Sequence, residues 1–275
     1  MRVLAIPDSH LKIDVIERGL ELAKYYRCDK IVLLGDYFDD WDAVPEQYHR
    51  MIDYLRKLLR LNPEVYPLLG NHEYGYFNPQ TKSSGYREYV AEELRDLFAN
   101  NFRFAVSASF DGVLYTHAGV TNMWLLQNKL ITERQLQYNV GKKAGAGYID
   151  NIIGRKDFGV DRNLGVRDWD VLAKVGAARG GLSGVAPSPI WADATEVIAD
   201  PLRCVKQVVG HSPVSEITNV GRVWFTDTYS NGNISDEYLV VNNGFPVIVH
   251  YGDIEDGIRR VKFREDAEDQ YSIGR

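Results

Sequence analysis

Five short motifs of the sequence carry side chains that readily bind metal ions. Each contains Asp, Asn or His, and each follows an apolar run of the chain. Carboxylate and amide oxygens with imidazole nitrogens, and no thiolates, favour manganese, iron or zinc over a structural zinc cage. The motifs are Asp8-Ser9-His10, Gly35-Asp36-Tyr37-Phe38-Asp39, Gly70-Asn71-His72-Glu73, Thr116-His117-Ala118-Gly119 and Gly210-His211-Ser212-Pro213.

Motifs of this composition suit a pair of metal ions that hydrolyse a phosphate ester. Two ions about 3.5–4 Å apart need a carboxylate that bridges them. We expect Asp36 in that role, because it sits between the other motifs. A water or hydroxide that bridges such ions has a lowered pKa and can attack phosphorus at neutral pH. The leaving oxygen then needs a proton, which a histidine beside the metals could supply.

The elements that position these motifs alternate between strand and helix. Continuous apolar runs at 3–6, 31–34 and 65–69 are typical of strands in a sheet that is covered on both faces. Apolar residues at helical spacing predict amphipathic helices over about 12–26 and 45–61. Ligands of open α/β sheets gather at the carboxyl ends of the strands, so we expect the five motifs to converge on one point.

The rest of the chain is expected to complete a single domain that spans residues 1–275. The Gly-rich segment 120–204 is less regular, and we expect this insertion to shape the substrate opening. Asp111-Gly112 is typical of a hairpin turn. Further elements are predicted as a helix at about 85–99, paired strands at 102–109 and 113–116, and strands at 205–209, 223–226, 238–241 and 247–251.

The composition excludes several classes of protein. With 275 residues, 45% of them hydrophobic and 25% charged, the chain is neither disordered nor fibrous. It contains no apolar run long enough to span a membrane, and its first apolar run is too short for a signal peptide, so we expect a cytoplasmic protein with no membrane contact. Cys28 and Cys204 form no disulfide framework and are expected to be buried thiols. A net charge of −6 argues against an extended nucleic-acid track.

Together, the motifs resemble those of the calcineurin-like metallophosphoesterase superfamily. The sequence looks most like the branch that holds the phosphoprotein phosphatases and the bacteriophage lambda phosphatase, and residues 224–228 resemble the closing strand of the phage-type enzymes. The resemblance implies an α/β fold in which two mixed β-sheets pack as a sandwich between flanking helices (α/β/β/α). It also implies two divalent metal ions as cofactors, with manganese favoured and iron, zinc or nickel as alternatives.

The resemblance implies a role for individual residues. His72 matches the histidine that acts as the general acid, and Asp39 matches the carboxylate that orients this histidine and raises its pKa. Glu73 is expected to make a supporting hydrogen bond. The implied metal ligands are Asp8 and His10 for the first ion, Asp36 for both ions, and Asn71, His117 and His211 for the second ion.

One position departs from the branch that the sequence resembles. Phosphoprotein phosphatases carry a phosphate-gripping arginine directly after the last aspartate of the second motif, where this chain has Asp40. A carboxylate there repels a phosphate dianion. Arg162, Arg167 and Arg179 of the Gly-rich segment are candidate substitutes. Arg179 is preferred, because the glycines after it let backbone N–H groups approach an anion.

These observations favour a phosphatase that acts on a phosphomonoester, in a phosphoprotein, a nucleotide or a small molecule. The alternative is a phosphodiesterase, a nuclease or a dinucleoside polyphosphate hydrolase, because a diester bears one negative charge and depends less on the arginine. Aromatic side chains beside two motifs could stack a base in that case. A non-catalytic binding scaffold is disfavoured, because every metal and acid position is present. The aromatic residues are Tyr37, Phe38, Trp41, Tyr74, Tyr76 and Phe77.

Overall fold

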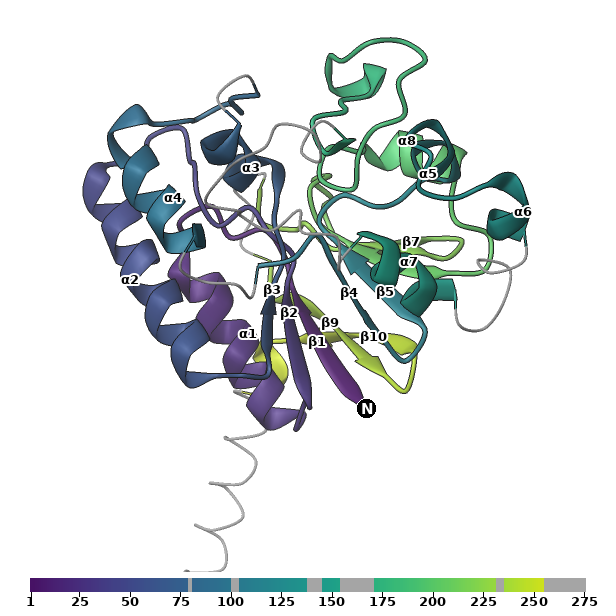
Figure 1. Cartoon of the computed structure of the whole chain (residues 1–275). Helices are drawn as coiled ribbons and strands as arrows, with labels where there is room; N and C mark the ends of the chain where they lie inside the picture. The colour runs from purple at the N-terminus through teal and green to yellow at the C-terminus, as the bar shows by residue number, and fades with distance from the viewer. Residues whose placement is uncertain (79–80, 100–103, 138–144, 154–170, 231–234, 255–275) are drawn as a thin grey trace, which may run out of the picture.

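Two mixed five-stranded sheets pack face to face, with helices on the outer side of each (Figure 1). The computed structural model describes residues 1–78, 81–99, 104–137, 145–153, 171–230 and 235–254. The strand order is β10-β9-β1-β2-β3 in the first sheet and β4-β5-β6-β8-β7 in the second. The predicted α/β/β/α sandwich is therefore confirmed.

The first sheet contains the strands that lead into the first three motifs. β1 (Arg2–Ile6), β2 (Lys30–Leu33) and β3 (Val65–Pro67) pair in parallel. β9 (Glu237–Asn242) pairs with β1 and with β10 (Phe245–His250), in both cases antiparallel. Because β1, β2 and β3 run in the same direction, the loops that follow them lie at the same edge of the sheet.

The second sheet contributes the strands before the other two motifs. β5 (Val113–Thr116) pairs in parallel with β6 (Lys206–Val209) and antiparallel with β4 (Ser107–Phe110). β8 (Val223–Phe225) continues from β6 in parallel, and β7 (Thr218–Val220) pairs antiparallel with β8. β5 and β6 therefore bring two more loops to one edge.

Apolar side chains from both sheets fill the layer between them. Val3 and Ala5 of β1 pack in this layer with Val208 of β6, whereas Leu4 and Ile6 belong to the core under the helices. Successive side chains of a strand point to opposite faces. Both faces of β1 are therefore buried, which explains its continuous apolar sequence.

Helices from the first half of the chain cover the first sheet. Figure 1 shows α1 (Ile13–Tyr25), α2 (Pro45–Leu61) and α4 (Ala91–Ala99) side by side on its outer side. The short α3 (Asn71–Phe77) and the 3₁₀ turn η1 (Glu88–Val90) connect β3 to α4. The predictions for 12–26 and 45–61 are confirmed to within one residue at each end.

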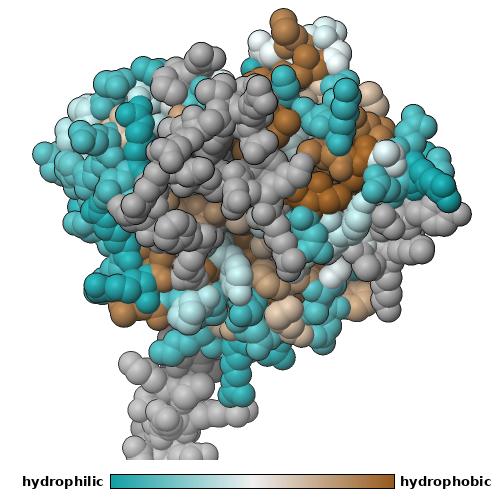
Figure 2. Space-filling model, viewed as in Figure 1, coloured by the Kyte–Doolittle hydropathy of each residue, from teal (hydrophilic) through white to brown (hydrophobic). Residues whose placement is uncertain are grey.

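Helices of the Gly-rich segment lie over the second sheet, where α7 contacts β4 and β5. The space-filling view shows apolar colour gathered over this half of the molecule, whereas the surface over α2 and α4 is mainly hydrophilic (Figure 2). The elements are α5 (Asn122–Gln127), α6 (Glu133–Gln135), α7 (Gly145–Ile153), the 3₁₀ turn η4 (Ala177–Arg179) and α8 (Ala194–Ala199).

Several details differ from the sequence predictions. The strand expected from residue 102 begins only at Ser107, and residues 100–103 lie outside the described part of the chain. Cys204 is exposed and Cys28 half-buried, so the expectation of two buried thiols is wrong. Burial raises the pKa of the Cys28 thiol to about 11, which makes it unreactive at neutral pH. Within the described residues, no helix combines the length and apolarity that crossing a membrane requires.

Candidate metal centre

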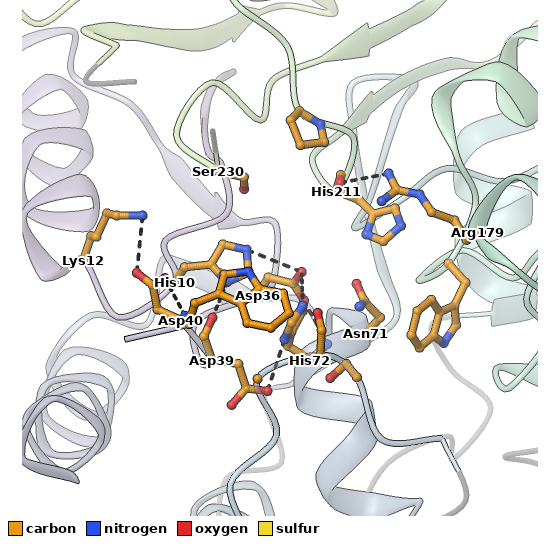
Figure 3. A pocket seen from close by; sticks show the side chains of 16 residues that line it. His10, Lys12, Asp36, Asp39, Asp40, Asn71, His72, Arg179, His211 and Ser230 are labelled. Atoms are coloured by element: carbon orange, nitrogen blue, oxygen red, sulfur yellow. Dashed lines mark hydrogen bonds and ion pairs between the residues drawn. The ribbon is translucent and has the colours of Figure 1, made fainter. Parts of the chain in front are cut away.

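The five predicted motifs meet at one end of the sandwich, where the two sheets present their parallel strand ends. Side chains from these loops line a pocket of about 350 Å³ (Figure 3). His10, Asp36, Asn71, His72 and His211 line this pocket, while Asp8 and His117 are buried in the same cluster. The structure therefore brings all the predicted ligand positions together from five separate segments that follow strands.

Two groups of metal-capable atoms share Asp36. His10, Asp36 and His72 form one group, and Asp36, His117 and His211 form the other, with the ligand atoms of each group within 4.8 Å of one another. Asn71 Oδ1 lies 3.0 Å from His117 Nε2 and adds an amide oxygen to the second group. One carboxylate at the junction of two ligand groups is the arrangement that a bridged pair of cations requires.

Two histidine rings are oriented by main-chain carbonyl groups. His10 Nδ1 donates to the carbonyl oxygen of Asp39 at 2.8 Å, and His117 Nδ1 donates to that of Leu34 at 2.9 Å. The opposite nitrogen of His117, Nε2, lies 3.3 Å from Asp36 Oδ2. Histidines that bind metals commonly donate their second ring N–H in this way, so both rings present Nε2 as a ligand.

Buried polar atoms in the cluster also fit a bound cation. Asp8 Oδ1 and His211 Nε2 are buried and have no hydrogen-bond partner among the described residues. Asp8 Oδ2 accepts the backbone N–H of His211 at 2.9 Å, which joins the first and last motifs. Burial, together with the charges of Asp227 and Asp36, raises the pKa of Asp8 well above its usual value. A divalent cation would offset these charges, so the residues fit metal binding.

The surroundings of the cluster favour the charged form of Asp36 and the neutral form of His211. Burial alone would raise the pKa of Asp36, but His117 and His72 hold it well below its usual value. Burial and the neighbouring His117 lower the pKa of His211 well below that of a free histidine. Asp36 is therefore ionised and His211 is neutral at pH 7, which are the forms that bind metals.

At two positions of the motifs a carboxylate lies so close to the main chain that only glycine fits. A Cβ atom on Gly70 would lie 2.0 Å from Asp36 Oδ1, and one on Gly210 would lie 2.0 Å from Asp8 Oδ1. Real Cβ atoms do not approach so closely. The glycines before Asn71 and His211 therefore make room for the carboxylates of the first two motifs.

Four residues of the site adopt a left-handed backbone conformation. The φ angles are 40° at His10, 50° at Asp36, 66° at Asp39 and 64° at His211. Such angles are unfavourable for residues with a side chain and persist where the surrounding structure imposes them, often at functional sites. The sharp turns after the strands direct these side chains into the pocket.

His72 and Asp39 form a hydrogen-bonded pair beside the metal-capable atoms. His72 Nδ1 donates to Asp39 Oδ2 at 3.1 Å. The other oxygen, Oδ1, accepts the hydroxyl groups of Tyr48, at 2.9 Å, and Tyr76. Burial by itself lowers the pKa of His72, but Asp36 and Asp39 raise it above the ordinary histidine value. These carboxylates favour the protonated form of His72, whose Nε2 lies 3.9 Å from Asp36 Oδ2.

Glu73 connects the second and third motifs through the main chain. It is fully buried and accepts the backbone N–H groups of Asp36, Tyr37 and Gly70 at 2.8, 2.9 and 2.9 Å. Burial and the charge of Asp36 raise the pKa of Glu73 to about 7. Its hydrogen bonds are the supporting kind expected from the sequence, and they fix the two loops relative to each other.

Arg179 lines the pocket next to His211. Its Nε lies 2.9 Å from Asp193 Oδ2, and one terminal nitrogen donates to the carbonyl oxygen of His211 at 3.3 Å and to Ser212 Oγ at 3.2 Å. Arg162 and Arg167, the other candidate arginines, lie outside the described residues. Arg179 is thus the candidate that the structure brings to the pocket.

The aromatic residues beside the motifs contribute mostly to the core. Trp41 is 75% exposed and lines the pocket, whereas the other five are at most 6% exposed. The hypothesis that these side chains stack a base is therefore wrong for all but Trp41. The buried five are Tyr37, Phe38, Tyr74, Tyr76 and Phe77.

The structure adds residues that the motifs did not single out. Lys12 and Ser230 line the pocket. Asp227 is buried, accepts Ser230 Oγ at 2.7 Å, and has a pKa raised by burial. The only sequence signal for Asp227 was its place in the segment 224–228, and Lys12 had no signal beyond its position two residues after His10.

Comparisons with known proteins agree with this geometry. The sequence model of the calcineurin-like phosphoesterases matches residues 1–250. No curated protein matches the chain. Among solved structures, a mutant of a cold-active protein tyrosine phosphatase matches with a TM-score of 0.58 and 20% sequence identity, over 91% of this chain and 78% of that chain. The cold-active protein tyrosine phosphatase of a psychrophilic Shewanella species matches with a TM-score of 0.55 at the same identity and coverage. At this identity, the two structures show a shared fold.

Proposed function

The chain belongs to the calcineurin-like phosphoesterase family, and from that premise we propose that it is a two-metal phosphomonoesterase with His72 as its general acid. Membership makes it a metal-dependent phosphoesterase. The number of ions, the roles of the residues and the substrate are the proposal. The observation that carries it is that Asp36 belongs to two groups of metal-capable atoms, and that His72, a member of the first group, is hydrogen-bonded to Asp39 and so has a partner suited to a general acid.

The proposed ligands supply only oxygen and imidazole nitrogen, which favours manganese, with iron, zinc or nickel as alternatives. When bound, two divalent ions stabilise the charge on the phosphoryl oxygens and lower the pKa of the attacking water. Asp8 and His10 would hold the first ion, Asn71, His117 and His211 would hold the second, and Asp36 would contribute to both.

His72 supplies the proton that the leaving group needs. Asp39 accepts the N–H on Nδ1 and thereby directs the second N–H, on Nε2, toward the centre of the pocket. The negative charges of Asp36 and Asp39 raise the pKa of His72 and so favour the form that carries this proton. A departing alkoxide takes the proton from Nε2 as the bond to phosphorus breaks.

Arg179 binds a phosphoryl oxygen in this account. Its ion pair with Asp193 and its hydrogen bonds next to His211 fix the guanidinium at the pocket wall, and an ordered arginine suits recognition of phosphate. Trp191 lines the same wall. Because Arg179 and Trp191 come from the Gly-rich insertion, we also propose that 120–204 shapes the substrate opening of a single domain, residues 1–275.

A substrate panel tests the proposal. The full chain, incubated with Mn²⁺, Ni²⁺, Mg²⁺ or Zn²⁺, is assayed with p-nitrophenyl phosphate, bis-p-nitrophenyl phosphate and diadenosine tetraphosphate. We expect faster hydrolysis of the monoester, dependent on metal and abolished by a chelator. Preference for the diester or the dinucleotide would favour the alternative hydrolases, and activity that survives removal of metal would contradict the proposal.

A further inference from the structure

Lys12 places a positive charge at the far end of the pocket from Arg179. Figure 3 shows the two cations on opposite sides, with His10, Asp36 and His72 between them. Lys12 Nζ lies 3.9 Å from Asp40 Oδ2, and both side chains are partly exposed. The pocket therefore has one cation on the side of His211 and another on the side of His10.

Lys12 has more N–H donors free for an incoming anion than Arg179 has. Arg179 already contacts Asp193, His211 and Ser212. Lys12 Nζ has no partner nearer than Asp40 among the described residues, and 3.9 Å exceeds a hydrogen bond. An ammonium group has three N–H donors, and a partly exposed ion pair of this length is weak. An incoming anion can therefore compete with Asp40 for Lys12.

Asp40 is the nearest charged partner of Lys12 among the described residues. The backbone N–H of Trp41 donates to Asp40 Oδ1 at 2.8 Å, which fixes the carboxylate and leaves Oδ2 toward Lys12. Asp40 stands at the position where the sequence departs from the phosphoprotein phosphatases. Instead of an arginine that grips the reacting phosphate, this chain has a carboxylate that faces a lysine from another segment at the pocket.

The position of Lys12 is on the leaving-group side. His10, two residues before Lys12, packs its ring edge-on against His72 with ring centroids 5.0 Å apart. Asp40 directly follows Asp39, the hydrogen-bond partner of His72. Since the general acid must meet the leaving oxygen, the groups beside His72 meet the remainder of the leaving group.

We propose that Lys12 makes this enzyme selective for phosphomonoesters whose leaving group carries a second anionic group, such as a carboxylate. This inference rests on the proposed function and deepens it. A second hollow, of about 410 Å³, is also lined by Lys12 and by residues of α1 and α2. Besides Lys12, its charged residues are Asp14, Glu17 and Arg50, of both signs. We therefore place the second anionic group of the substrate at Lys12 and not deeper in this hollow.

Two substrates of the same shape test this selectivity. 4-Carboxyphenyl phosphate and 4-carbamoylphenyl phosphate differ by one negative charge in the leaving group, and the ratio of their kcat/KM values isolates that charge. In the Mn²⁺-loaded full chain at low salt, we expect Lys12→Met to lower this ratio about three- to fivefold, the upper part of the range for a partly exposed charge pair. Lys12→Arg should keep the ratio, and Asp40→Asn should keep or raise it.

Matched controls separate this role from a general effect on charge or folding. Lys24→Met removes an exposed lysine from the other end of α1 and should leave the ratio unchanged. Lys12→Gln serves as a second neutral variant if Lys12→Met does not fold. An equal ratio in the wild type and the neutral variants, with hydrolysis intact, overturns the inference and leaves the phosphomonoesterase standing. Absence of metal-dependent hydrolysis in the wild type overturns both.

Discussion

The floor and the rim of the pocket are built in different ways. The floor is buried, and two of its residues, Asp36 and His211, turn their side chains inward from left-handed backbone positions shortly after strands. The rim is partly or largely exposed and lies on loops beyond the strand ends. In the mechanism proposed above, the sheets fix where the chemistry occurs, whereas the loops select the substrate. The floor comprises Asp8, Asp36, Asn71, His117 and His211, and the rim comprises Lys12, Asp40, Trp41 and Arg179.

The largest effect is expected at the centre of the floor. Asp36→Asn removes the one carboxylate that both ligand groups share, so we expect loss of bound metal and a fall in kcat of about 10⁴-fold or more, since the attacking water is then no longer activated. Metal analysis and steady-state kinetics measure the two effects. Asp53→Asn, at an exposed position of α2, is the matched control. Full activity of Asp36→Asn would mean that the floor is not the catalytic site.

Replacement of His72 should have a smaller effect and should separate proton transfer from metal binding. His72→Ala should lower kcat for an alkyl phosphate by about 10²–10⁴-fold while metal stays bound, because a poor leaving group needs the proton most. An activated aryl phosphate should be affected less. Wild-type turnover of the alkyl phosphate by this variant would remove His72 from the mechanism.

The pH dependence tests the partner of His72. Asp36 and Asp39 raise the pKa of His72, so its acid form persists to higher pH than in a free histidine. Asp39→Asn removes one of these charges and lowers the pKa of His72. We therefore expect the alkaline limb of the kcat–pH profile to move to lower pH, with a loss of about 10- to 100-fold in kcat at neutral pH. If the alkaline limb of Asp39→Asn lies at the same pH as that of the wild type, Asp39 does not act through His72.

Substitutions at the rim should change the activity least. Trp41→Ala removes a side chain that is 75% exposed, so we expect a loss of about two- to fivefold in kcat/KM for an aryl phosphate, from lost contact with the ring. An alkyl phosphate and the melting temperature should be almost unaffected. A loss comparable to that of the floor variants would erase the distinction between floor and rim.

The same distinction explains what could be predicted from the sequence. His117 and His211 were predictable because each directly follows an apolar strand, and parallel strands present their ends at one edge. The position of Lys12 at the pocket was not predictable, because the positive φ angles of His10 and Leu11 determine the direction of the chain before it. Nothing in the sequence indicates that Asp40 pairs with Lys12, or that Arg179 pairs with Asp193.

Three other features could not be predicted from the sequence. The motif Asn71-His72-Glu73 itself begins α3, a short helix that the sequence analysis did not predict. The strand Thr218–Val220 is short, exposed and at the edge of its sheet, and therefore lacks the apolar pattern that marked the buried strands. Tyr37 and Tyr76 lie beside site residues but are buried, which flanking position alone cannot reveal.

Anomalous diffraction from crystals of the full chain with Mn²⁺ tests the central claim most directly. The account predicts two anomalous peaks on either side of the Asp36 carboxylate, one beside Asp8 and His10 and the other beside Asn71, His117 and His211. Peaks elsewhere, or crystals in which Mn²⁺ does not bind at Asp36, would contradict it.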